Sequence, residues 1–327
     1  MKKIRWGIVG PGEIANKFAK AIANVEEASL VAVASRSETR GRAFAEKYNI
    51  EKVFGSYEDM ANSGDIDAVY ISTPHPFHKP CAEIFLNKGK HILCEKPLCV
   101  NAKEAKELSK CAKKNNVFLM EAMWTRFIPA IIRVQELVRN GAIGDVRGIE
   151  ASFCYASSPE EEAKLFQNQM AGGSLLDVGV YGLHFTSLFL GSNPVSVSAE
   201  AHIEYGCDSH TNVVLRSENG AIASVTSATR VEKPADAYIY GTKGHIYIPH
   251  FYGATEFFVR NGEEEEKIYA PYIGDGFEEE IKEACRCIEG GKLESETLPH
   301  SESIAIIRLM DEIRDKIGVR YPFDGEK

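Results

Sequence analysis

The chain has 327 residues, more than one hydrophobic core usually serves, so two domains are expected. Hydrophobic residues make up 44% and charged residues 26%, which excludes a disordered chain, a coiled coil and a membrane protein. The net charge of -9 offers no basic surface to nucleic acid or to an anionic membrane, so the expected ligands are small molecules.

The N-terminus and the cysteines carry expectations about the compartment. Only a short apolar run follows Met1-Lys2-Lys3 before Gly10, too short for a secretory signal, so we expect a cytoplasmic protein. The eight cysteines are scattered and form no C-x-x-C pair. We therefore expect reduced, mostly packed thiols and no metal site.

Strands and helices alternate over the first 120 residues. Apolar runs predict strands at 4–9, 30–34, 68–71, 92–94 and 117–120, and helix-period spacing predicts helices at 14–25 and 39–48. The strands show no polar face, which is typical of a doubly wound parallel sheet covered by helices on both sides. We predict such an α/β domain over residues 1–123.

A glycine turn joins the first strand to the first helix, in the sequence GPGEIA from Gly10 to Ala15. Gly10 allows a sharp turn, and Gly12 allows the backbone to approach a pyrophosphate. The N–H groups at the helix start, at Glu13 and Ile14, would face the phosphates. In this strand-turn-helix context the motif predicts dinucleotide binding.

The end of the second strand indicates which dinucleotide is bound. After Ser35 the chain has Arg36, where a cofactor without a 2′-phosphate would usually meet an Asp or Glu. Arg36 and Arg40, one helical turn apart, offer guanidinium groups that match a phosphate. The alternative is that both are solvated surface charges. NADP(H) is therefore favoured over NAD(H).

Polar residues also follow the next three strands, where a parallel sheet binds its ligand. These ends contain Ser72-Thr-Pro-His75…His78, Glu95-Lys96-Pro97 and Glu121-Ala-Met-Trp-Thr-Arg126. The candidate cofactor contacts among them are Thr73, Pro74, His75, His78, Glu95, Lys96, Trp124 and Arg126. The two histidines could instead cap the following helix. Pro97 fixes the backbone beside Lys96, which makes this triplet the more specific signal.

In the second half of the chain, apolar residues recur with a different period. Apolar and polar residues alternate without a break from Val195 to Ile203, which predicts a strand with one buried face. Further strands are expected at 211–216, 221–227, 237–240, 245–248 and 256–259, joined by glycine-containing turns. We predict an α+β domain with a large open antiparallel sheet over residues 124–327, and a solvated tip at the acidic run 263–266.

A glycine-rich entry to a helix lies between the two halves, at Gly172-Gly173. The helix that follows carries Asp177 and Tyr181 four residues apart, on one face. The pair could be a structural hydrogen bond. The alternative is catalysis, which the close backbone approach at the glycines and the need for a proton carrier near Lys96 both favour.

Hydride transfer at a carbinol carbon needs a group that removes or donates the hydroxyl proton. Lowering the pKa of a tyrosine from ~10 by about 3 costs about 4 kcal/mol, which an ammonium ~4 Å away supplies at an effective dielectric of ~20. We predict that Tyr181 is the general acid/base and that Lys96 lowers its pKa. Glu95 would keep the lysine charged and aimed.

These motifs together resemble the Gfo/Idh/MocA oxidoreductases over essentially the whole chain, with Glu95-Lys96-Pro97 as the most specific match. The sequence MEAMWTRF from Met120 to Phe127, with Tyr181, is similar to the branch of dimeric dihydrodiol dehydrogenases, also described as NADP-dependent D-xylose dehydrogenases. The resemblance implies a Rossmann domain, a homodimer through the exposed face of the open sheet, and Lys96 with Tyr181 as catalytic pair. Many family members carry His at the position of Tyr181, so those members are poorer guides to the substrate.

The leading hypothesis is an NADP(H)-dependent oxidoreductase acting on a CH–OH group of a sugar, polyol or trans-dihydrodiol, with Lys96, Tyr181 and Asp177 as catalytic residues. Four aromatic residues are candidate walls for the substrate, or core packing: Trp124, Phe127, Phe153 and Tyr155. A non-catalytic NADP-binding sensor of the same fold is the alternative from another class. A periplasmic oxidoreductase with tightly bound cofactor is disfavoured by the missing signal sequence.

Overall fold

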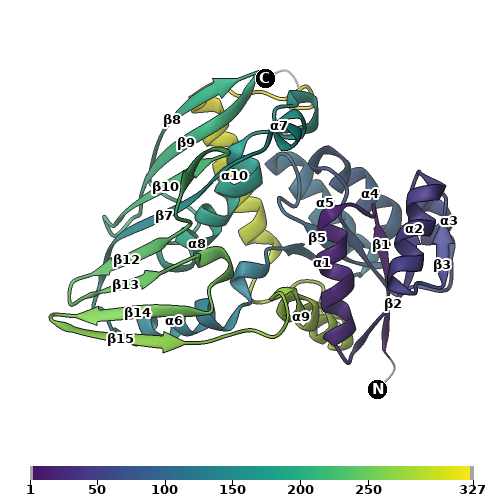
Figure 1. The fold of residues 1–327 in the computed structure, drawn as a ribbon, viewed down its shortest axis with the longest axis horizontal. Coiled ribbons are helices and arrows are strands. Elements are labelled where there is room, and N and C mark those ends of the chain that lie inside the picture. The colour runs from purple at the N-terminus through teal and green to yellow at the C-terminus, as the bar shows by residue number, and fades with distance from the viewer. Residues whose placement is uncertain (1–2, 325–327) are drawn as a thin grey trace. The chain divides into compact units, whose positions relative to one another are not determined.

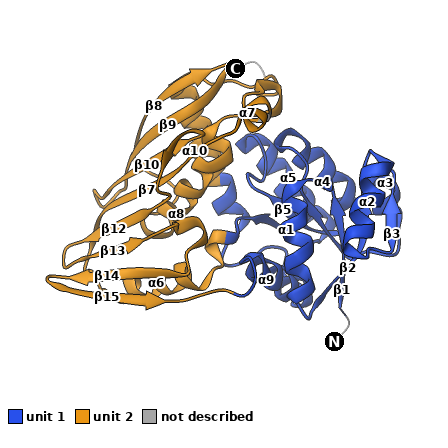
Figure 2. Ribbon diagram, in the orientation of Figure 1, with its two compact units in different colours: residues 1–124, 273–304 blue, residues 125–272, 305–327 orange. Residues whose placement is uncertain are grey.

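The computed structural model describes residues 3–324, and the chain divides into two compact units (Figure 2). Unit 1 comprises residues 1–124 and 273–304, and unit 2 comprises residues 125–272 and 305–327. The sequence-based division placed 273–304 in the second domain. This segment groups with unit 1 because helix α9 (Phe277–Glu289) packs against α1 (Glu13–Ala21) and the short helix η1 (Ile22–Asn24).

Unit 1 contains a parallel sheet in the order β3-β2-β1-β4-β5-β6 (Figure 1). Its strands are β1 (Ile4–Val9), β2 (Ala28–Ala34), β3 (Lys52–Phe54), β4 (Ala68–Ile71), β5 (His91–Glu95) and β6 (Leu119–Ala122). Its other helices are α2 (Glu38–Tyr48), α3 (Tyr57–Asn62), α4 (His78–Leu86) and α5 (Ala102–Asn115). The central strands β4 and β5 are almost wholly buried, as their unbroken apolar sequences predict.

Unit 2 contains, within the described part of the chain, a nine-stranded sheet in the order β15-β14-β13-β12-β7-β10-β9-β8, with β11 paired to β7. The strands are β7 (Val146–Ala156), β8 (Ser196–Glu204), β9 (Cys207–Arg216), β10 (Ile222–Ala228), β11 (Arg230–Lys233), β12 (Ala237–Gly241), β13 (His245–Ile248), β14 (Glu256–Asn261) and β15 (Glu264–Tyr269). The sheet is mostly antiparallel, but its central pair, β7 and β10, is parallel. The predicted fold class is confirmed, with a mixed sheet in the second domain.

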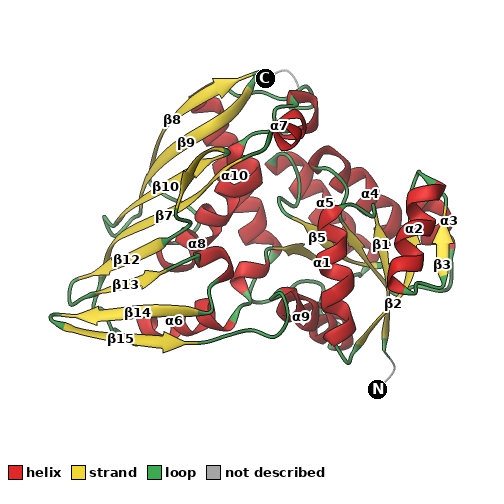
Figure 3. Ribbon diagram, in the orientation of Figure 1, coloured by secondary structure: helices red, strands yellow, loops and turns green. Residues whose placement is uncertain are grey.

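Helices cover one face of this sheet (Figure 3). They include α6 (Pro129–Arg139), the π-helix η5 (Leu175–Gly179), α8 (Val180–Leu190) and the later part of α10 (His300–Ile317); α7 (Pro159–Leu165) is short. α8 lies close on the sheet because Gly182 has no side chain: a Cβ there would come within 2.6 Å of Val225 Cγ1. The helix that carries Tyr181 is therefore held by the central strands.

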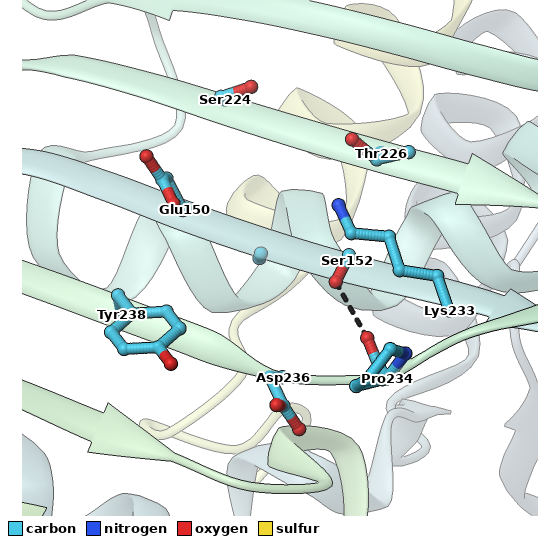
Figure 4. Close-up of a pocket in the computed structure, with 9 residues that line it drawn as sticks. Glu150, Ser152, Ser224, Thr226, Lys233, Pro234, Asp236 and Tyr238 are labelled. Atoms are coloured by element: carbon cyan, nitrogen blue, oxygen red, sulfur yellow. Dashed lines mark hydrogen bonds between the residues drawn. The ribbon is translucent and has the colours of Figure 1, made fainter.

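The opposite face of the sheet is open. Alternate residues of β9 and β10 point to it, among them Val214 and Ile222, which are 47% and 51% exposed. A pocket opens on the same face (Figure 4), where Ser152 Oγ donates a hydrogen bond to the carbonyl of Pro234 at 2.8 Å. The acidic run 263–266 is exposed at the edge of this sheet, where charge discourages pairing with another chain.

Candidate active site

The glycine turn of unit 1 has the geometry that its sequence predicts. Gly10 has a φ of +84°, and a Cβ there would lie 3.0 Å from Thr73 Cγ2. A Cβ on Gly12 would meet no atom closer than 4.0 Å, so space lies beside the start of α1. No side chain caps that helix start. Its N–H groups thus fit the pyrophosphate of a dinucleotide.

Two arginines stand exposed after the end of β2. The Arg36 guanidinium lies 5.5 Å from the centre of the Phe77 ring. Among residues 3–324, no carboxylate forms an ion pair with Arg36 or Arg40, whereas the neighbouring Arg42 pairs with Glu38 at 2.6 Å. Two such guanidinium groups fit a 2′-phosphate.

His78 ties the end of β4 to the turn after β5. Its ring is fully buried, with Nε2 2.7 Å from the carbonyl oxygen of Thr73 and Nδ1 2.8 Å from that of Pro97. His75 packs edge-on against it, with ring centres 5.8 Å apart. His78 is the first residue of α4, but its ring bridges two loops at the carboxyl edge of the sheet.

Glu95 and Lys96 lie where β5 ends. Glu95 is buried, and its Oε1 accepts a hydrogen bond from the Tyr70 hydroxyl. Its Oε2 accepts the backbone N–H of Lys96 at 3.1 Å, which fixes the main chain at the lysine. Burial raises the pKa of Glu95. The Lys96–Pro97 bond is cis, and the Lys96 side chain is half-buried.

Trp124 is buried in unit 1, where it stacks on Phe277 with ring centres 5.3 Å apart. Arg126 and Phe127 are buried in unit 2. Arg126 Nη1 lies 3.1 Å from His184 Nδ1 and 3.4 Å from Ser187 Oγ, both on α8. These contacts bind the guanidinium of Arg126 to the helix that also carries Tyr181.

The remaining predicted residues come together in unit 2. Tyr181 is 9% exposed, and the centre of its ring lies 5.4 Å from that of Phe153. The Tyr155 hydroxyl donates a hydrogen bond to Asp177 Oδ2 at 2.9 Å. Burial, followed by the charge of Asp177, raises the pKa of Tyr155 far above its ordinary value, so this phenol stays protonated.

Sequence reasoning missed a third tyrosine in this group. Tyr252, in the short helix η6 (Phe251–Gly253), stacks on Phe153 with ring centres 4.1 Å apart. Its ring centre lies 6.0 Å from that of Tyr181. Thr125 Oγ1 donates to the Tyr252 carbonyl at 2.6 Å and holds the turn in place. No periodic pattern in the sequence marks this turn, so the stacked pair of Phe153 and Tyr252 becomes visible only in the fold.

The described residues contain no helix long and apolar enough to cross a membrane. They also contain no group of three or more His, Cys, Asp or Glu side chains arranged to hold a metal ion. All eight cysteines are unpaired, and all but Cys111 are buried.

Comparisons with known proteins match both units. Residues 4–123 match the model of the oxidoreductase family with an NAD-binding Rossmann fold, and residues 131–247 match the GFO/IDH/MocA C-terminal domain. The chain is 39% identical to trans-1,2-dihydrobenzene-1,2-diol dehydrogenase of Mus musculus, over 98% of this chain and 99% of the relative.

Solved structures share the fold. A 3-ketoreductase from Actinomadura kijaniata, in complex with NADP and TDP-benzene, is 25% identical, with a TM-score of 0.88 and coverage of 97% of this chain and 98% of that one. An aldose-aldose oxidoreductase from Caulobacter crescentus, complexed with glycerol, is 24% identical, with the same TM-score and coverage of 96% and 97%. This chain belongs to the Gfo/Idh/MocA family of oxidoreductases.

Proposed function

We propose that the chain is an NADP(H)-dependent dehydrogenase that transfers a hydride between the nicotinamide and a CH–OH group of a trans-dihydrodiol, sugar or polyol. The observation that carries the proposal is the anchoring of Lys96 at the carboxyl end of β5, through its backbone N–H and Glu95 Oε2. The 39% identity to a trans-dihydrodiol dehydrogenase favours a diol as substrate.

The cofactor, when bound, accepts or supplies the hydride at its nicotinamide ring. The chain would bind and orient it: the N–H groups after Gly12 would hold the pyrophosphate, and Arg36 and Arg40 would hold the 2′-phosphate. Neither guanidinium forms an ion pair with a carboxylate among residues 3–324, and this supports the choice of NADP(H) over NAD(H). His75, with Ser35, Thr73 and Pro74, would line the same edge of the sheet, and the buried ring of His78 would hold the two loops there in place.

Tyr181 moves the proton. In the oxidation direction its phenolate accepts the proton of the substrate hydroxyl, and in the reduction direction its phenol returns it. Lys96 would assist as an ammonium: at about 4 Å from the phenol, its charge would make the phenolate accessible at neutral pH. Asp177, held by the Tyr155 hydroxyl, would accept a hydrogen bond from a second substrate hydroxyl. Residues 1–123 would thus bind the cofactor, and 124–327 the substrate.

Aromatic rings would form the wall of the substrate site. Phe153 and Tyr252 present a stacked pair beside Tyr181, a surface suited to the flat ring of a dihydrodiol or to the C–H face of a sugar. Trp124 and Phe127 are more deeply packed. This difference supports Phe153, more than the other two, as a substrate contact.

We also propose a homodimer through the open face of the sheet. Its support is the row of apolar and aromatic side chains across several strands, with Val214 and Ile222 exposed and Tyr238 half-buried. A monomer would leave this surface in water.

An activity panel tests the catalytic proposal. The wild type and Tyr181→Phe are assayed with NADP+ against trans-dihydrodiols, aldoses and polyols, and the variant should lose at least about 100-fold in kcat. Equal rates would remove the acid/base role of Tyr181. Tight NADP+ binding without turnover on any substrate would instead support the sensor.

A further inference from the structure

Asp208, on β9, is a buried carboxylate that the proposed mechanism does not use. It has no exposed surface. Its Oδ2 accepts three hydrogen bonds: from Ser174 Oγ at 2.7 Å, from the Leu175 backbone N–H at 2.7 Å and from Thr211 Oγ1 at 2.8 Å. Two of the three donors belong to the start of the helical segment that carries Asp177 and Tyr181.

That helix start has no cap of its own. The π-helix η5 begins at Leu175 and continues directly into α8, and no side chain of the segment caps either start. The first N–H groups of a helix need acceptors, and negative charge there is stabilising. Asp208 supplies an acceptor from a neighbouring strand of the sheet, which also fixes where the helix begins.

The two glycines before the helix fit this arrangement. A Cβ on Gly173, whose φ is +125°, would come within 2.3 Å of Asp208 Oδ1. A Cβ on Gly172 would come within 1.9 Å of the Leu165 carbonyl oxygen. The close approach that the sequence predicted at these glycines is therefore an approach to Asp208 and to backbone of the same unit.

A contact from the C-terminal segment fixes the same turn. The Tyr321 hydroxyl donates a hydrogen bond to the Gly172 carbonyl at 2.8 Å, and its ring is buried. The helix start is thus held from β9 on one side and from residue 321 on the other. Asp177 is two residues beyond Leu175, and Tyr181 six, so a shift of the start moves both side chains.

We infer that Asp208 is a positioning residue for the reaction: its carboxylate sets the start of the η5–α8 segment and thereby the places of Asp177 and Tyr181. The inference rests on the proposed acid/base role of Tyr181. An error of about 1 Å in the placement of a catalytic group costs about 100-fold in rate. Asp208 therefore controls kcat without touching the substrate or the cofactor.

Asp208→Asn tests this with little change of shape, because the amide replaces one carboxylate oxygen with an N–H donor that faces other donors. We expect kcat to fall about 10- to 100-fold while the KM for NADP+ changes less than about twofold. We also expect the limb of the pH–rate profile that Tyr181→Phe abolishes to move to another pH. If Asp208→Asn folds poorly, Ser174→Ala takes its place: it leaves the carboxylate, removes one of its three donors together with the contacts of Ser174 to Ser227, and should give the same pattern more weakly.

Asp67→Asn is the matched control. Asp67 accepts three hydrogen bonds from Arg5 at the opposite edge of the unit 1 sheet, so its loss destabilises the protein with no link to Tyr181. The inference is overturned if Asp208→Asn folds and keeps the wild-type kcat and pH–rate profile. It is also overturned if Asp67→Asn loses kcat to the same extent as Asp208→Asn. Tyr181→Phe is assayed in the same series. Full activity of that variant would show that the proposed function itself is wrong.

Discussion

The Tyr155 hydroxyl donates a hydrogen bond to Asp177 Oδ2 at 2.9 Å, so one candidate substrate contact holds a candidate catalytic carboxylate. Tyr155 lies on β7 and Asp177 on the π-helix η5. The bond joins the central strand of the sheet to the segment that carries Tyr181.

Removing this bond should lower activity without removing a titrating group. In Tyr155→Phe the carboxylate of Asp177 loses a donor and its fixed orientation, so we expect kcat/KM to fall about 10-fold. Burial raises the pKa of Tyr155 far above its ordinary value, so the pH–rate profile should keep its shape. A lost limb in that profile would show that Tyr155, and not Tyr181, carries the proton.

Arg36→Ala should weaken NADPH binding about 10- to 100-fold and leave NADH binding almost unchanged, because only NADPH has a 2′-phosphate to pair with the guanidinium. Titration of cofactor fluorescence measures both constants. Arg42→Ala is the control, since Arg42 already pairs with Glu38 on the surface. Equal weakening of the two cofactors in Arg36→Ala would discard the assignment.

Glu280 should make the protein less stable as pH rises. It is fully buried on α9, and neither carboxyl oxygen has a hydrogen-bond partner among the described residues. Burial, followed by the nearby Glu95, raises the pKa of Glu280 well above its ordinary value. The folded state therefore binds this proton more tightly than the unfolded chain does. The stabilising effect of that proton is complete at pH values below the pKa of Glu280 in the unfolded chain. It is lost as the pH rises toward the pKa of Glu280 in the folded protein.

Glu280→Gln keeps the shape of the neutral acid and removes this dependence. We expect the variant to gain stability relative to wild type from pH 5 to pH 8, by up to about 1.4 kcal/mol per pH unit. Urea unfolding at several pH values measures it, with Glu279→Gln, on the same helix and paired with Lys282, as control. If the difference in the free energy of unfolding between the variant and the wild type stayed constant across this range, Glu280 would be ionised in the folded protein.

Gly173→Ala should destabilise the fold by about 1–3 kcal/mol from backbone strain alone, before the clash with Asp208 adds to it. The positive φ and the 2.3 Å approach of a Cβ to Asp208 Oδ1 are the reasons. Thermal unfolding measures the loss, and Gly89→Ala, at a φ of +70° with no atom within 4 Å, gives the cost of the ordinary left-handed region for comparison. Equal losses in the two variants would show that the contact with Asp208 adds nothing.

Ile222→Asp should dissociate the proposed dimer, because it places a charge within the open face. Light scattering after size exclusion gives the mass, and Ile132→Asp, on α6, is the control of similar exposure. A wild type that is monomeric at micromolar concentration would contradict the dimer.

Most strands of the first unit could be predicted from sequence because they are short apolar runs set between helices, but the three-residue β3 was not predicted. β1 and β4 begin and end at the predicted residues. Segment 273–304 was assigned to the second domain, because what joins it to unit 1 is packing of α9 on α1, and no local pattern records such a contact.

In the second unit β7 was missed, although Ile149, Ala151 and Phe153 alternate along it with period two. β15 was missed because its acidic sequence suits a solvated edge and shows no apolar face.

Residues of the candidate site could be predicted where charged side chains or glycines follow the ends of parallel strands. Glu95, Lys96 and the glycine turn stand where a parallel sheet binds ligands, and their sequence context identifies them. Tyr252 and Asp208 were not predictable, because one lies in an irregular turn and the other within a strand. Their roles depend on neighbours more than 30 residues away in sequence, Phe153 and Ser174.

The most direct measurement is the pH dependence of kcat/KM with NADP+ and a trans-dihydrodiol, for wild type, Lys96→Met and Tyr181→Phe. If the ammonium of Lys96 lowers the pKa of the Tyr181 phenol, the limb at neutral pH in wild type moves to higher pH in Lys96→Met and is absent in Tyr181→Phe. A limb that stays at the same pH without Lys96 would contradict the pairing of these two residues.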